Sequence, residues 1–397
     1  MQVKNWIIKQ DIDHGKIIEQ ISKWSSICTG SYHQKGLVTL EDILFQELNQ
    51  FPGQVSRVAL DPIPVWGDQG VQSRLTSSLL KLEVRPHCSK QILLMIHYDT
   101  VFGEGSPFQT VLQRGDTLYG PGVCDAKSGI VILLESLKIL EKSPWAEDLG
   151  YCVVLNPDEE IGSPASNSFL QKLKKSYQFA LLYEPCLENG NLAGNRKGSG
   201  NFAYEFHGKS AHAGRDFYSG KNAILMLNEV ITKVNALNHE FKNLTANIAV
   251  VKGGNAFNVV PDYATLRFNV RVQDLDTMNK VNRVLEEMNS ELKNKGYDFE
   301  FHGSFQAPPK HIHTDLSRYV KATHNEYGIS IDYEDSGGVC DGNRLAYYGI
   351  PNVDTMGGWG GKIHSSEEYL RTDSLVPKIR INSDILIRFA KNEWQGV

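Results

Sequence analysis

The chain has 397 residues, of which 41% are hydrophobic and 22% charged, and it is long enough for two domains with sizeable cores. A net charge of -5 and a pI near 6.2 give no electrostatic reason to expect nucleic acid as a partner. No apolar run approaches the roughly 20 residues that span a bilayer, and the first residues lack the apolar stretch of a signal peptide. We therefore expect a cytoplasmic protein that binds neither nucleic acid nor membrane.

The six cysteines are scattered along the chain, and no two form a Cys-x-x-Cys pair. Because the chain is large and shows no export signal, we interpret them as reduced thiols. Cys124 and Cys186 stand beside candidate metal ligands, so a thiolate ligand is an alternative to ordinary packing.

The first half of the chain has the pattern of an open α/β sheet. Helical spacing of apolar residues predicts helices over residues 17–27, 40–48 and 129–140. Three short runs that are apolar at every position predict strands buried on both faces, over residues 92–96, 151–155 and 179–183. Sheets of this kind bind ligands beyond the carboxyl ends of their strands.

The pattern changes after residue 198. Strands are predicted over residues 201–207, 245–251, 263–272 and 297–305, and helices over residues 222–237 and 275–292. This β-α-β-β-α-β order is that of a ferredoxin-like module. The chain then returns with a helix near residues 315–327 and Gly-rich loops. We therefore predict a catalytic domain of residues 1–198 and 312–397, with an inserted domain of residues 199–311.

Several candidate metal ligands follow the predicted buried strands. His97, Glu159, Glu160 and Glu184 come directly after the three apolar runs. Two further candidates lie in Gly-rich loops: Asp125 and His364. Two imidazoles with several carboxylates suit a pair of divalent ions that share one water, which predicts a two-metal hydrolase.

Each of these residues also has an ordinary interpretation. Asp125 precedes a helix and could cap it, and His364 could be a histidine of a surface loop. The adjacent Glu159 and Glu160 could form a solvated loop tip, since buried without cations they would repel each other. His97 and Asp99 point to the same side of a strand, so Asp99 could orient the imidazole; the ordinary interpretation is a His-Asp pair at a strand end that only forms a hydrogen bond. The shared strand-end positions favour the metal site.

The ordered motifs resemble the di-zinc aminoacylase family of metallopeptidases. They are Ile-His-Tyr-Asp-Thr-Val, Gly-Pro-Gly-Val-Cys-Asp-Ala-Lys-Ser-Gly, Asp-Glu-Glu-Ile-Gly-Ser, Glu-Pro, Gly-Lys-Ser-Ala-His-Ala-Gly, Asn-Val-Val-Pro and His-Ser-Ser-Glu-Glu-Tyr. Family members include glutamate carboxypeptidase (carboxypeptidase G), acetylornithine deacetylase and succinyl-diaminopimelate desuccinylase. The resemblance covers nearly the whole chain. It implies a zinc-peptidase-like α/β catalytic domain with an inserted ferredoxin-like α+β dimerisation (lid) domain.

The resemblance also implies a set of metal ligands, with Asp125 bridging two divalent ions. His97 and Glu184 complete one site, and Glu160 and His364 complete the other. Zn²⁺ is the ion we expect, and Co²⁺ or Mn²⁺ would suit the same ligands. A cis peptide bond is expected after Asp125.

The catalytic roles that the resemblance implies are those of Glu159 as general base and of Asp99 as the residue that orients the metal-binding histidine. His212 resembles the histidine that reaches the active site of the neighbouring subunit and stabilises the oxyanion, which implies a homodimer. Asn258 and Arg271 resemble substrate-binding residues. The alternatives are a loop histidine at His212 and a strand salt bridge at Arg271.

These roles predict hydrolysis of a peptide or N-acyl amide bond in a small amino-acid-derived substrate, as in a carboxypeptidase or a deacylase. The stretch 305–309, around Ala307, lacks the arginine of the glutamate carboxypeptidase branch, and residues 336–341 depart from the usual loop, so glutamate specificity stays open. We expect a substrate with a free carboxylate. The alternatives are an aminopeptidase (di- or tripeptidase) of the same family and a catalytically silent metal-binding dimer. A nucleotide-binding protein is disfavoured, because no phosphate-binding glycine loop follows the first strand.

Overall fold

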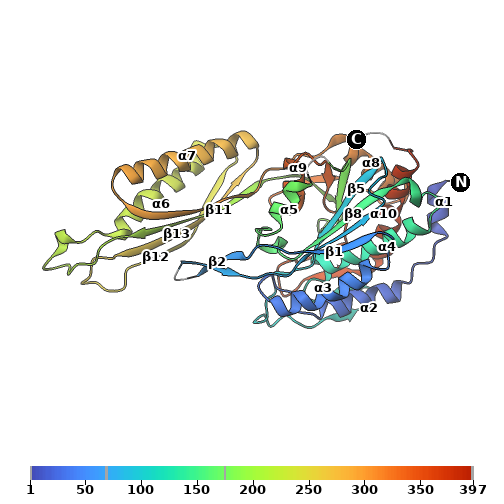
Figure 1. Cartoon of the computed structure of the whole chain (residues 1–397), viewed down its shortest axis with the longest axis horizontal. Coiled ribbons are helices and arrows are strands. Elements are labelled where there is room, and N and C mark those ends of the chain that lie inside the picture. Colours follow the sequence, from blue (N-terminus) through green and yellow to red (C-terminus); the bar gives the residue numbers. More distant parts are fainter. Residues whose placement is uncertain (1, 68–69, 174–175, 395–397) are drawn as a thin grey trace. The chain divides into compact units, whose positions relative to one another are not determined.

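The structure is a computed structural model that describes residues 2–67, 70–173 and 176–394 (Figure 1). It divides into two compact units. The first consists of Met1–Asn195, His311–Ser336 and Cys340–Val397, and the second of Arg196–Lys310 and Gly337–Val339. The sequence placed the boundaries near residues 198 and 311 but did not indicate that the short segment 337–339 belongs with the insert.

The first unit is built on a six-stranded sheet with the order β1-β4-β8-β5-β9-β16. Its strands are β1 (Gln54–Val58), β4 (Leu79–Val84), β5 (Gln91–His97), β8 (Gly150–Asn156), β9 (Phe179–Leu182) and β16 (Asn352–Val353). The four strands β8, β5, β9 and β16 run parallel, whereas β4 and β1 are antiparallel to their neighbours. The three predicted apolar runs are β5, β8 and β9 at the centre of this sheet.

The sheet is buried on both faces, which explains why its central strands are apolar at every position. On β5, Ile92 and Leu94 belong to the large core that contains α4 (Gly129–Lys142) and α10 (Leu375–Ala390). The intervening Leu93 and Met95 face a second core with α5 (Asn167–Lys172) and α9 (Asp341–Tyr347). Successive side chains of a strand point to opposite faces, so an apolar residue is needed at each position.

Further elements complete the first unit. Its other helices are α1 (Val3–Ile8), α2 (His14–Ser25), α3 (Gln34–Leu48) and α8 (Thr314–Glu326). A hairpin pairs β2 (Ile63–Gly67) with β3 (Gly70–Arg74), and a small sheet has the order β17-β18-β7-β6. The strands of that sheet are β6 (Leu112–Arg114), β7 (Thr117–Tyr119), β17 (Gly360–Gly361) and β18 (Tyr369–Arg371). Among the described helices, none combines the length and apolar character needed to cross a membrane.

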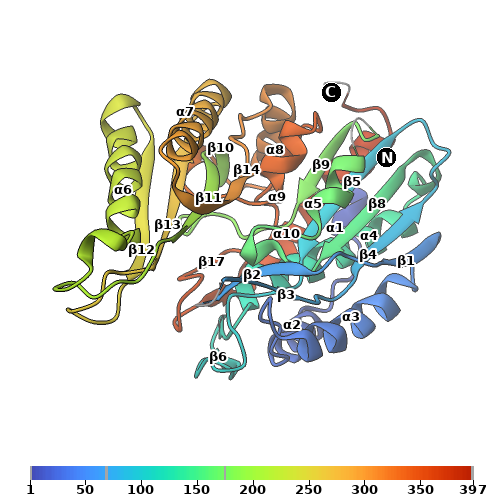
Figure 2. The ribbon, with the colours of Figure 1, turned by 60° about the vertical axis from the view of Figure 1, so that its left-hand side comes forward.

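The second unit is a four-stranded antiparallel sheet with two helices on one face (Figures 1 and 2). In chain order its main elements are β11 (Gly198–His207), α6 (Ala223–Glu240), β12 (Thr245–Gly253), β13 (Tyr263–Val272), α7 (Leu275–Asn294) and β14 (Asp298–Ala307). The sheet order β12-β13-β11-β14 makes the unit ferredoxin-like, as the alternation of elements predicted. Every second residue of β11, at Phe202, Tyr204 and Phe206, lies in the core beside the helices.

Candidate metal centre

The candidate ligands meet at one edge of the first unit's sheet because three parallel strands end there. His97 is the last residue of β5 and pairs in register with Asn156, the last residue of β8. Met95 of β5 pairs with Leu182, the last residue of β9. The residues that follow these ends therefore lie next to one another, as the sequence predicted from the apolar runs.

One cluster consists of His97, Asp125 and Glu184, all buried, whose candidate ligand atoms lie within 4.8 Å of one another. The Nε2 atom of His97 is 3.1 Å from Asp125 Oδ1 and 3.4 Å from Glu184 Oε2. Burial opposes a charge on this imidazole, but Glu184 and Asp125 raise the pKa of His97 well above its usual value. One histidine nitrogen thus faces two carboxylates at the end of β5.

A second cluster shares Asp125 with the first and adds Glu160 and His364. The Nε2 atom of His364 is 3.1 Å from Glu160 Oε2 and 3.3 Å from Asp125 Oδ2. These two carboxylates raise the pKa of His364 to about 11. The two oxygens of Asp125 therefore face different clusters, and the Asp125–Ala126 peptide bond is cis, as the resemblance implied.

The loop that carries His364 reaches Asp125 through the small sheet. β17 and β18 flank His364 in the sequence and pair with each other, and β18 also pairs with β7. β7 ends at Tyr119, shortly before the loop that bears Asp125. This pairing brings together two loops that are far apart in the sequence.

The residues present fit a pair of divalent cations. Each cluster supplies two carboxylates and one imidazole, which are ligands typical of zinc and related ions. The Oε1 atom of Glu160 is buried, and no described group forms a hydrogen bond with it. Burial and the neighbouring Asp125 raise the pKa of Glu160. Cations would neutralise this concentration of carboxylates and would displace the protons from the imidazoles.

Asp99 is fully buried and contacts both His97 and the turn that carries Glu159 and Glu160. Its Oδ1 atom is 3.3 Å from Nδ1 of His97, the nitrogen on the far side of the ring from Asp125. It also accepts hydrogen bonds from the backbone N–H groups of Glu159 and Glu160, both at 3.2 Å, and from the Ser31 hydroxyl at 2.7 Å. Asp99 thus lies where it can orient His97, as proposed from the sequence, and it also holds the turn that carries both glutamates.

Glu159 begins a short 3-10 turn, Glu159–Ile161, directly after β8. Burial raises the pKa of Glu159 well above its usual value, and the charge of Glu184 adds to this effect. Glu159 belongs to neither ligand cluster, but it directly precedes Glu160, a member of the second cluster, on the same turn. A carboxyl group in this position can exchange protons with a water or a substrate at the centre.

Two residues that were not expected from the sequence hold the loops of the site. The carboxylate of Glu368 accepts hydrogen bonds from the backbone N–H groups of Gly122, Cys124 and Asp125 at 2.9 to 3.1 Å. Asp341, at the start of α9, accepts hydrogen bonds from Asn156 and Ser163, on either side of the Glu159–Glu160 turn. Glu368 stands within the His-Ser-Ser-Glu-Glu motif, which was the available signal.

A buried lysine balances part of the negative charge. Lys127 donates hydrogen bonds to Thr29 Oγ1 at 2.6 Å and to the Tyr98 carbonyl at 2.9 Å. Burial lowers the pKa of Lys127 to about 8, although nearby carboxylates, Asp99 foremost, oppose this shift.

All six cysteines are free, and burial raises the pKa of Cys124, which favours the neutral thiol there over a thiolate ligand.

The remaining predicted residues belong to the second unit. His212 and Asn258 lie on adjacent exposed loops: His212 pairs with Val259, and the Ala213 N–H donates to the Asn258 carbonyl at 3.0 Å. Arg271 is half-buried on β13 and donates from Nε to Asn269 Oδ1 at 3.0 Å. Its Nη1 donates to the Gly337 carbonyl at 3.3 Å, and no described carboxylate pairs with it, so the alternative of a salt bridge is not supported.

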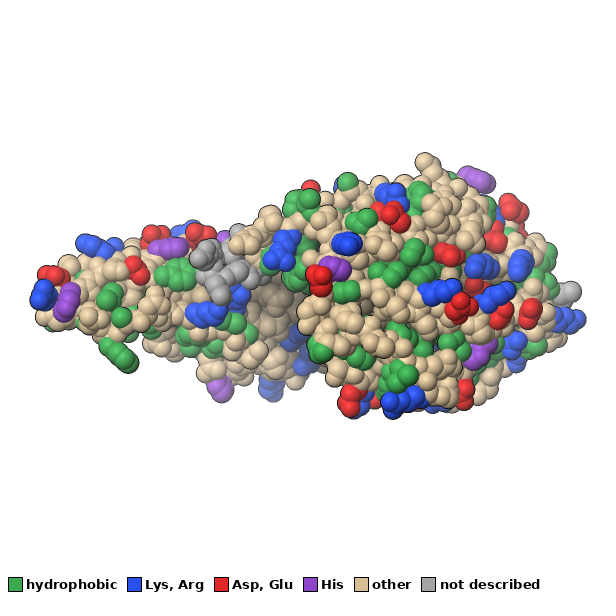
Figure 3. Space-filling model, turned by 90° about the horizontal axis from the view of Figure 1, so that it is seen from below, with side chains coloured by type: hydrophobic (Ala, Val, Ile, Leu, Met, Phe, Trp, Pro, Cys, Tyr) green, Lys and Arg blue, Asp and Glu red, His purple; other side chains and the backbone are tan. Residues whose placement is uncertain are grey.

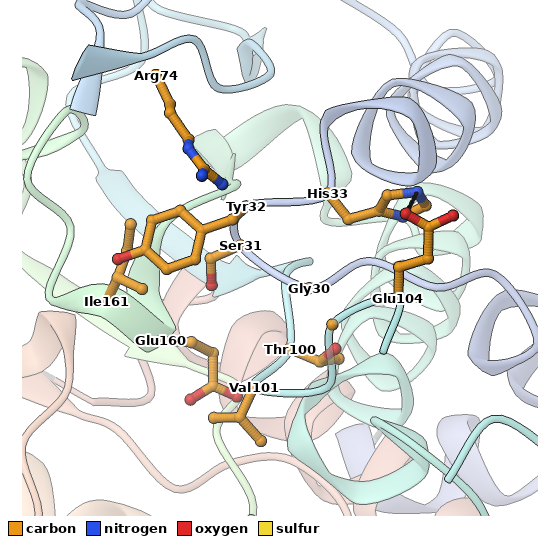
Figure 4. A pocket seen from close by; sticks show the side chains of 11 residues that line it. Gly30, Ser31, Tyr32, His33, Arg74, Thr100, Val101, Glu104, Glu160 and Ile161 are labelled. Atoms are coloured by element: carbon orange, nitrogen blue, oxygen red, sulfur yellow. Dashed lines mark ion pairs between the residues drawn. The ribbon is translucent and has the colours of Figure 1, made fainter. Parts of the chain in front are cut away.

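A pocket of about 410 Å³ opens beside the metal centre in the first unit. Glu160 belongs to both the pocket wall and the second ligand cluster. Figure 4 shows the other labelled walls, which include Tyr32 and Arg74. On the face seen in Figure 3, basic and acidic side chains are interspersed.

Comparison with known proteins places these features in a family. Residues 93–388 match peptidase family M20/M25/M40. The chain is 28% identical to carboxypeptidase G2 of a Pseudomonas species over 377 residues, which are 91% of this chain and 86% of that protein. An M20 family metallo-carboxypeptidase from Sulfolobus solfataricus has a similar fold, with a TM-score of 0.74, 15% identity and coverage of 96% and 100% of the two chains. A dinuclear metal-binding M20 peptidase from Bacillus subtilis also has a similar fold. Its TM-score is 0.65 and its sequence identity 15%, and the match covers 95% of this chain and 98% of that one.

The family match spans well over half of the chain and includes all five candidate metal ligands. It confirms the family resemblance, and the structural likeness confirms the α/β fold class. The chain belongs to peptidase family M20/M25/M40, and it is a metal-dependent hydrolase of peptide or amide C–N bonds.

Proposed function

We propose that this protein is a cytoplasmic di-metal hydrolase that cleaves a peptide or N-acyl amide bond of a small amino-acid-derived substrate. The observation that carries this proposal is the pair of ligand clusters that share Asp125, with Glu159 beside them. The similarity to carboxypeptidase G2 supports a substrate whose leaving part is an amino acid with a free carboxylate. The alternative, an aminopeptidase, differs in requiring a free amino end.

The proposed ligands are His97 and Glu184 for one ion, Glu160 and His364 for the other, and Asp125 for both. Zinc is the ion that we propose, since two imidazoles with carboxylates suit it, and cobalt or manganese would suit the same set. The bound ions would supply Lewis acidity, which polarises the scissile carbonyl and acidifies the attacking water.

Glu159 is proposed to take the proton of the attacking water and to give it to the leaving nitrogen. Hydrogen bonds from the backbone N–H groups of Glu159 and Glu160 to Asp99 hold the turn that carries this carboxylate. Without cations, burial keeps Glu159 protonated over a wider pH range, which would block its role as a base. Cations nearby would favour its ionised form.

His212 is proposed to donate a hydrogen bond to the oxyanion in the active site of a second copy of the chain. Its Nδ1 accepts a hydrogen bond from the Gly214 N–H at 3.1 Å, so the ring proton of the neutral form resides on Nε2. The ring is exposed, and Nε2 has no hydrogen bond among the described residues. A donor oriented in this way can stabilise a developing negative charge.

A homodimer is part of the same proposal. β12 is an edge strand of the second unit's sheet, so one side of its backbone is unpaired within that sheet. Exposed apolar side chains occur on this strand and on the adjacent helix, at Val251, Ile224 and Leu225.

Arg271 and Asn258 of the second unit are proposed to bind the carboxylate of the leaving amino acid.

The experiment that tests the chemistry is Glu159→Gln. We expect kcat to fall by about 10²–10⁴-fold or more, because the base and acid of the reaction are removed. Elemental analysis should still find two ions per chain, since Glu159 is outside both clusters. Glu47→Gln, a change of a half-buried glutamate on α3 in the same unit, is the matched control. Unchanged turnover in Glu159→Gln would overturn the assignment.

A further inference from the structure

The pocket beside Glu160 has a composition that the proposed chemistry does not explain. It is formed entirely by the first unit and has a volume of about 410 Å³, within the range of small-molecule sites. Its lining residues are Gly30, Ser31, Tyr32, His33, Arg74, Thr100, Val101, Gly103, Glu104, Glu160 and Ile161. Glu160 is also a candidate metal ligand. A substrate group in this pocket would therefore be separated by only a few covalent bonds from the bond that is cleaved at the metals.

Arg74 is the cation of this pocket. It ends strand β3 and is exposed, and Figure 4 shows its guanidinium pointing into the space beside the Tyr32 ring. The guanidinium carbon is 5.9 Å from the centre of that ring, which is within the range of a cation–π contact. No carboxylate among the described residues forms an ion pair with Arg74.

The two carboxylates of the pocket are committed elsewhere. Glu104 is 3.8 Å from Nε2 of His33, and Figure 4 shows this pair at the side of the pocket. Glu160 faces Asp125 and His364 in the metal centre. The arginine is therefore available to an anionic group that enters from solvent.

The walls between Arg74 and the metal centre suit a short hydrocarbon segment. Val101 is 41% exposed and Ile161 lines the same space, so apolar surface is available for contact. Gly30 presents only backbone, and a Cβ atom there would come within 2.6 Å of the Gly103 Cα. The pocket thus has the candidate metal ligand Glu160 at one wall and the cation Arg74 at another, with apolar side chains between them.

We propose that this pocket binds the acyl side of the substrate and selects acyl groups that carry a second carboxylate, which Arg74 binds. This inference rests on the proposed hydrolase function, in which Arg271 and Asn258 take the carboxylate of the leaving amino acid. The acyl group is a short dicarboxylic acyl chain, such as succinyl. The same carboxylate could instead belong to an amino-terminal aspartyl residue, which is a succinyl group with an added α-amino group.

The test uses three substrates with one leaving amino acid: the N-succinyl, the neutral N-succinamoyl and the α-aspartyl derivatives. We expect the ratio of kcat/KM for succinyl to that for succinamoyl to exceed unity in the unchanged protein. Arg74→Gln should lower this ratio by about tenfold or more, as expected for loss of a charge-assisted hydrogen bond, and Arg74→Lys should retain part of it. Arg114→Gln is the matched control, since Arg114 also lies over a tyrosine ring, at 5.8 Å from Tyr119.

Affinity gives a readout that does not need turnover. In a Glu159→Gln background, calorimetry should show that Arg74→Gln weakens binding of the succinyl compound far more than that of the succinamoyl compound. If the unchanged protein hydrolyses none of the three and no other N-acyl amino acid or dipeptide, but keeps this difference in affinity, the proposed function fails and the pocket assignment stands. Hydrolysis with equal preference for the two, or a ratio that Arg74→Gln leaves unchanged, would overturn the pocket assignment alone. A preference for aspartyl over succinyl would identify a peptide as the source of the carboxylate.

Discussion

The metal centre of the first unit and the His212–Asn258 loops of the second unit are opposite kinds of site. In the first, Asp99, Asp125 and His97 are nearly inaccessible and follow or contact the ends of buried strands. In the second, His212 and Asn258 are exposed on loops, and their hydrogen bonds are mainly local. Residues on rigid strand ends can hold a fixed geometry by themselves. An exposed histidine acquires a catalytic role only from what docks against it, and a second subunit would supply this.

Among substitutions in the two sites, we expect a change of Asp125 to cause the largest loss of bound metal and activity, because Asp125 belongs to both ligand clusters. Asp125→Ala should release both ions and abolish hydrolysis, whereas His364→Ala should weaken mainly the ion of its own cluster. Elemental analysis after dialysis measures the bound metal in each variant. Equal metal contents in the two variants would show that Asp125 does not bridge the clusters.

His212→Ala should have the next largest effect, a loss of about 10²–10³-fold in kcat, because one oxyanion donor is removed. The metal content should not change, since His212 belongs to the other unit. His239→Ala, at an exposed position on α6, is the control.

Subunit mixing distinguishes action across the dimer from action within one chain. A hybrid of His212→Ala and Glu159→Gln chains contains one site with both functional residues if His212 acts on the partner. Random exchange of subunits should then restore about a quarter of the full activity, because half of the dimers are hybrids. Two inactive variants that stay inactive after mixing would contradict a role for His212 across subunits.

A smaller effect concerns the stability of the first unit in acid. His324 is buried in that unit, and burial, with the nearby Lys378, lowers its pKa from 6.5 to about 3. The unfolded chain binds the proton below pH 6.5 and the folded chain does not, so stability should fall as the pH drops from about 6.5 toward 3. The contribution of this group is about 1.4 kcal/mol per pH unit in that window. None of the described histidines in the second unit is buried.

His324→Leu should remove this contribution and flatten the pH dependence of unfolding. Tryptophan fluorescence in urea at several pH values measures it, and all six tryptophans lie in the first unit, so the signal reports that unit. The unfolding midpoint of the variant should depend less on pH between 6.5 and 4. An unchanged slope would show that His324 is protonated in the folded state.

The same contrast explains which parts the sequence could predict. The runs that became β5, β8 and β9 are apolar on both faces, so both the strands and the ligands at their ends were visible in the sequence. The β-α-β-β-α-β order likewise indicated the ferredoxin-like unit. The helix predicted at residues 40–48 begins earlier, at Gln34, and its residue Gly36 packs against the Cys28 carbonyl, where a Cβ atom would not fit.

What could not be predicted depends on contacts between distant segments. Glu368 holds the Asp125 loop from 243 residues away, and Asp341 holds the turn of Glu159 from 178 to 185 residues away. The Tyr32–Arg74 pocket is also assembled from separate segments of the chain. Periodicity and local motifs carry no information on such pairings. Only the folded chain shows which carboxylate accepts which backbone N–H.

The strand-end clusters are proposed to bind two ions that are required for cleavage of a C–N bond. The most direct measurement is hydrolysis of N-acyl amino acids and N-blocked and N-free dipeptides by chelated protein, as zinc is added back and bound zinc is counted. We predict that activity on some of these substrates returns as the bound zinc approaches two ions per chain. Full activity without bound metal, or two bound ions with no cleavage of any substrate, would contradict the account.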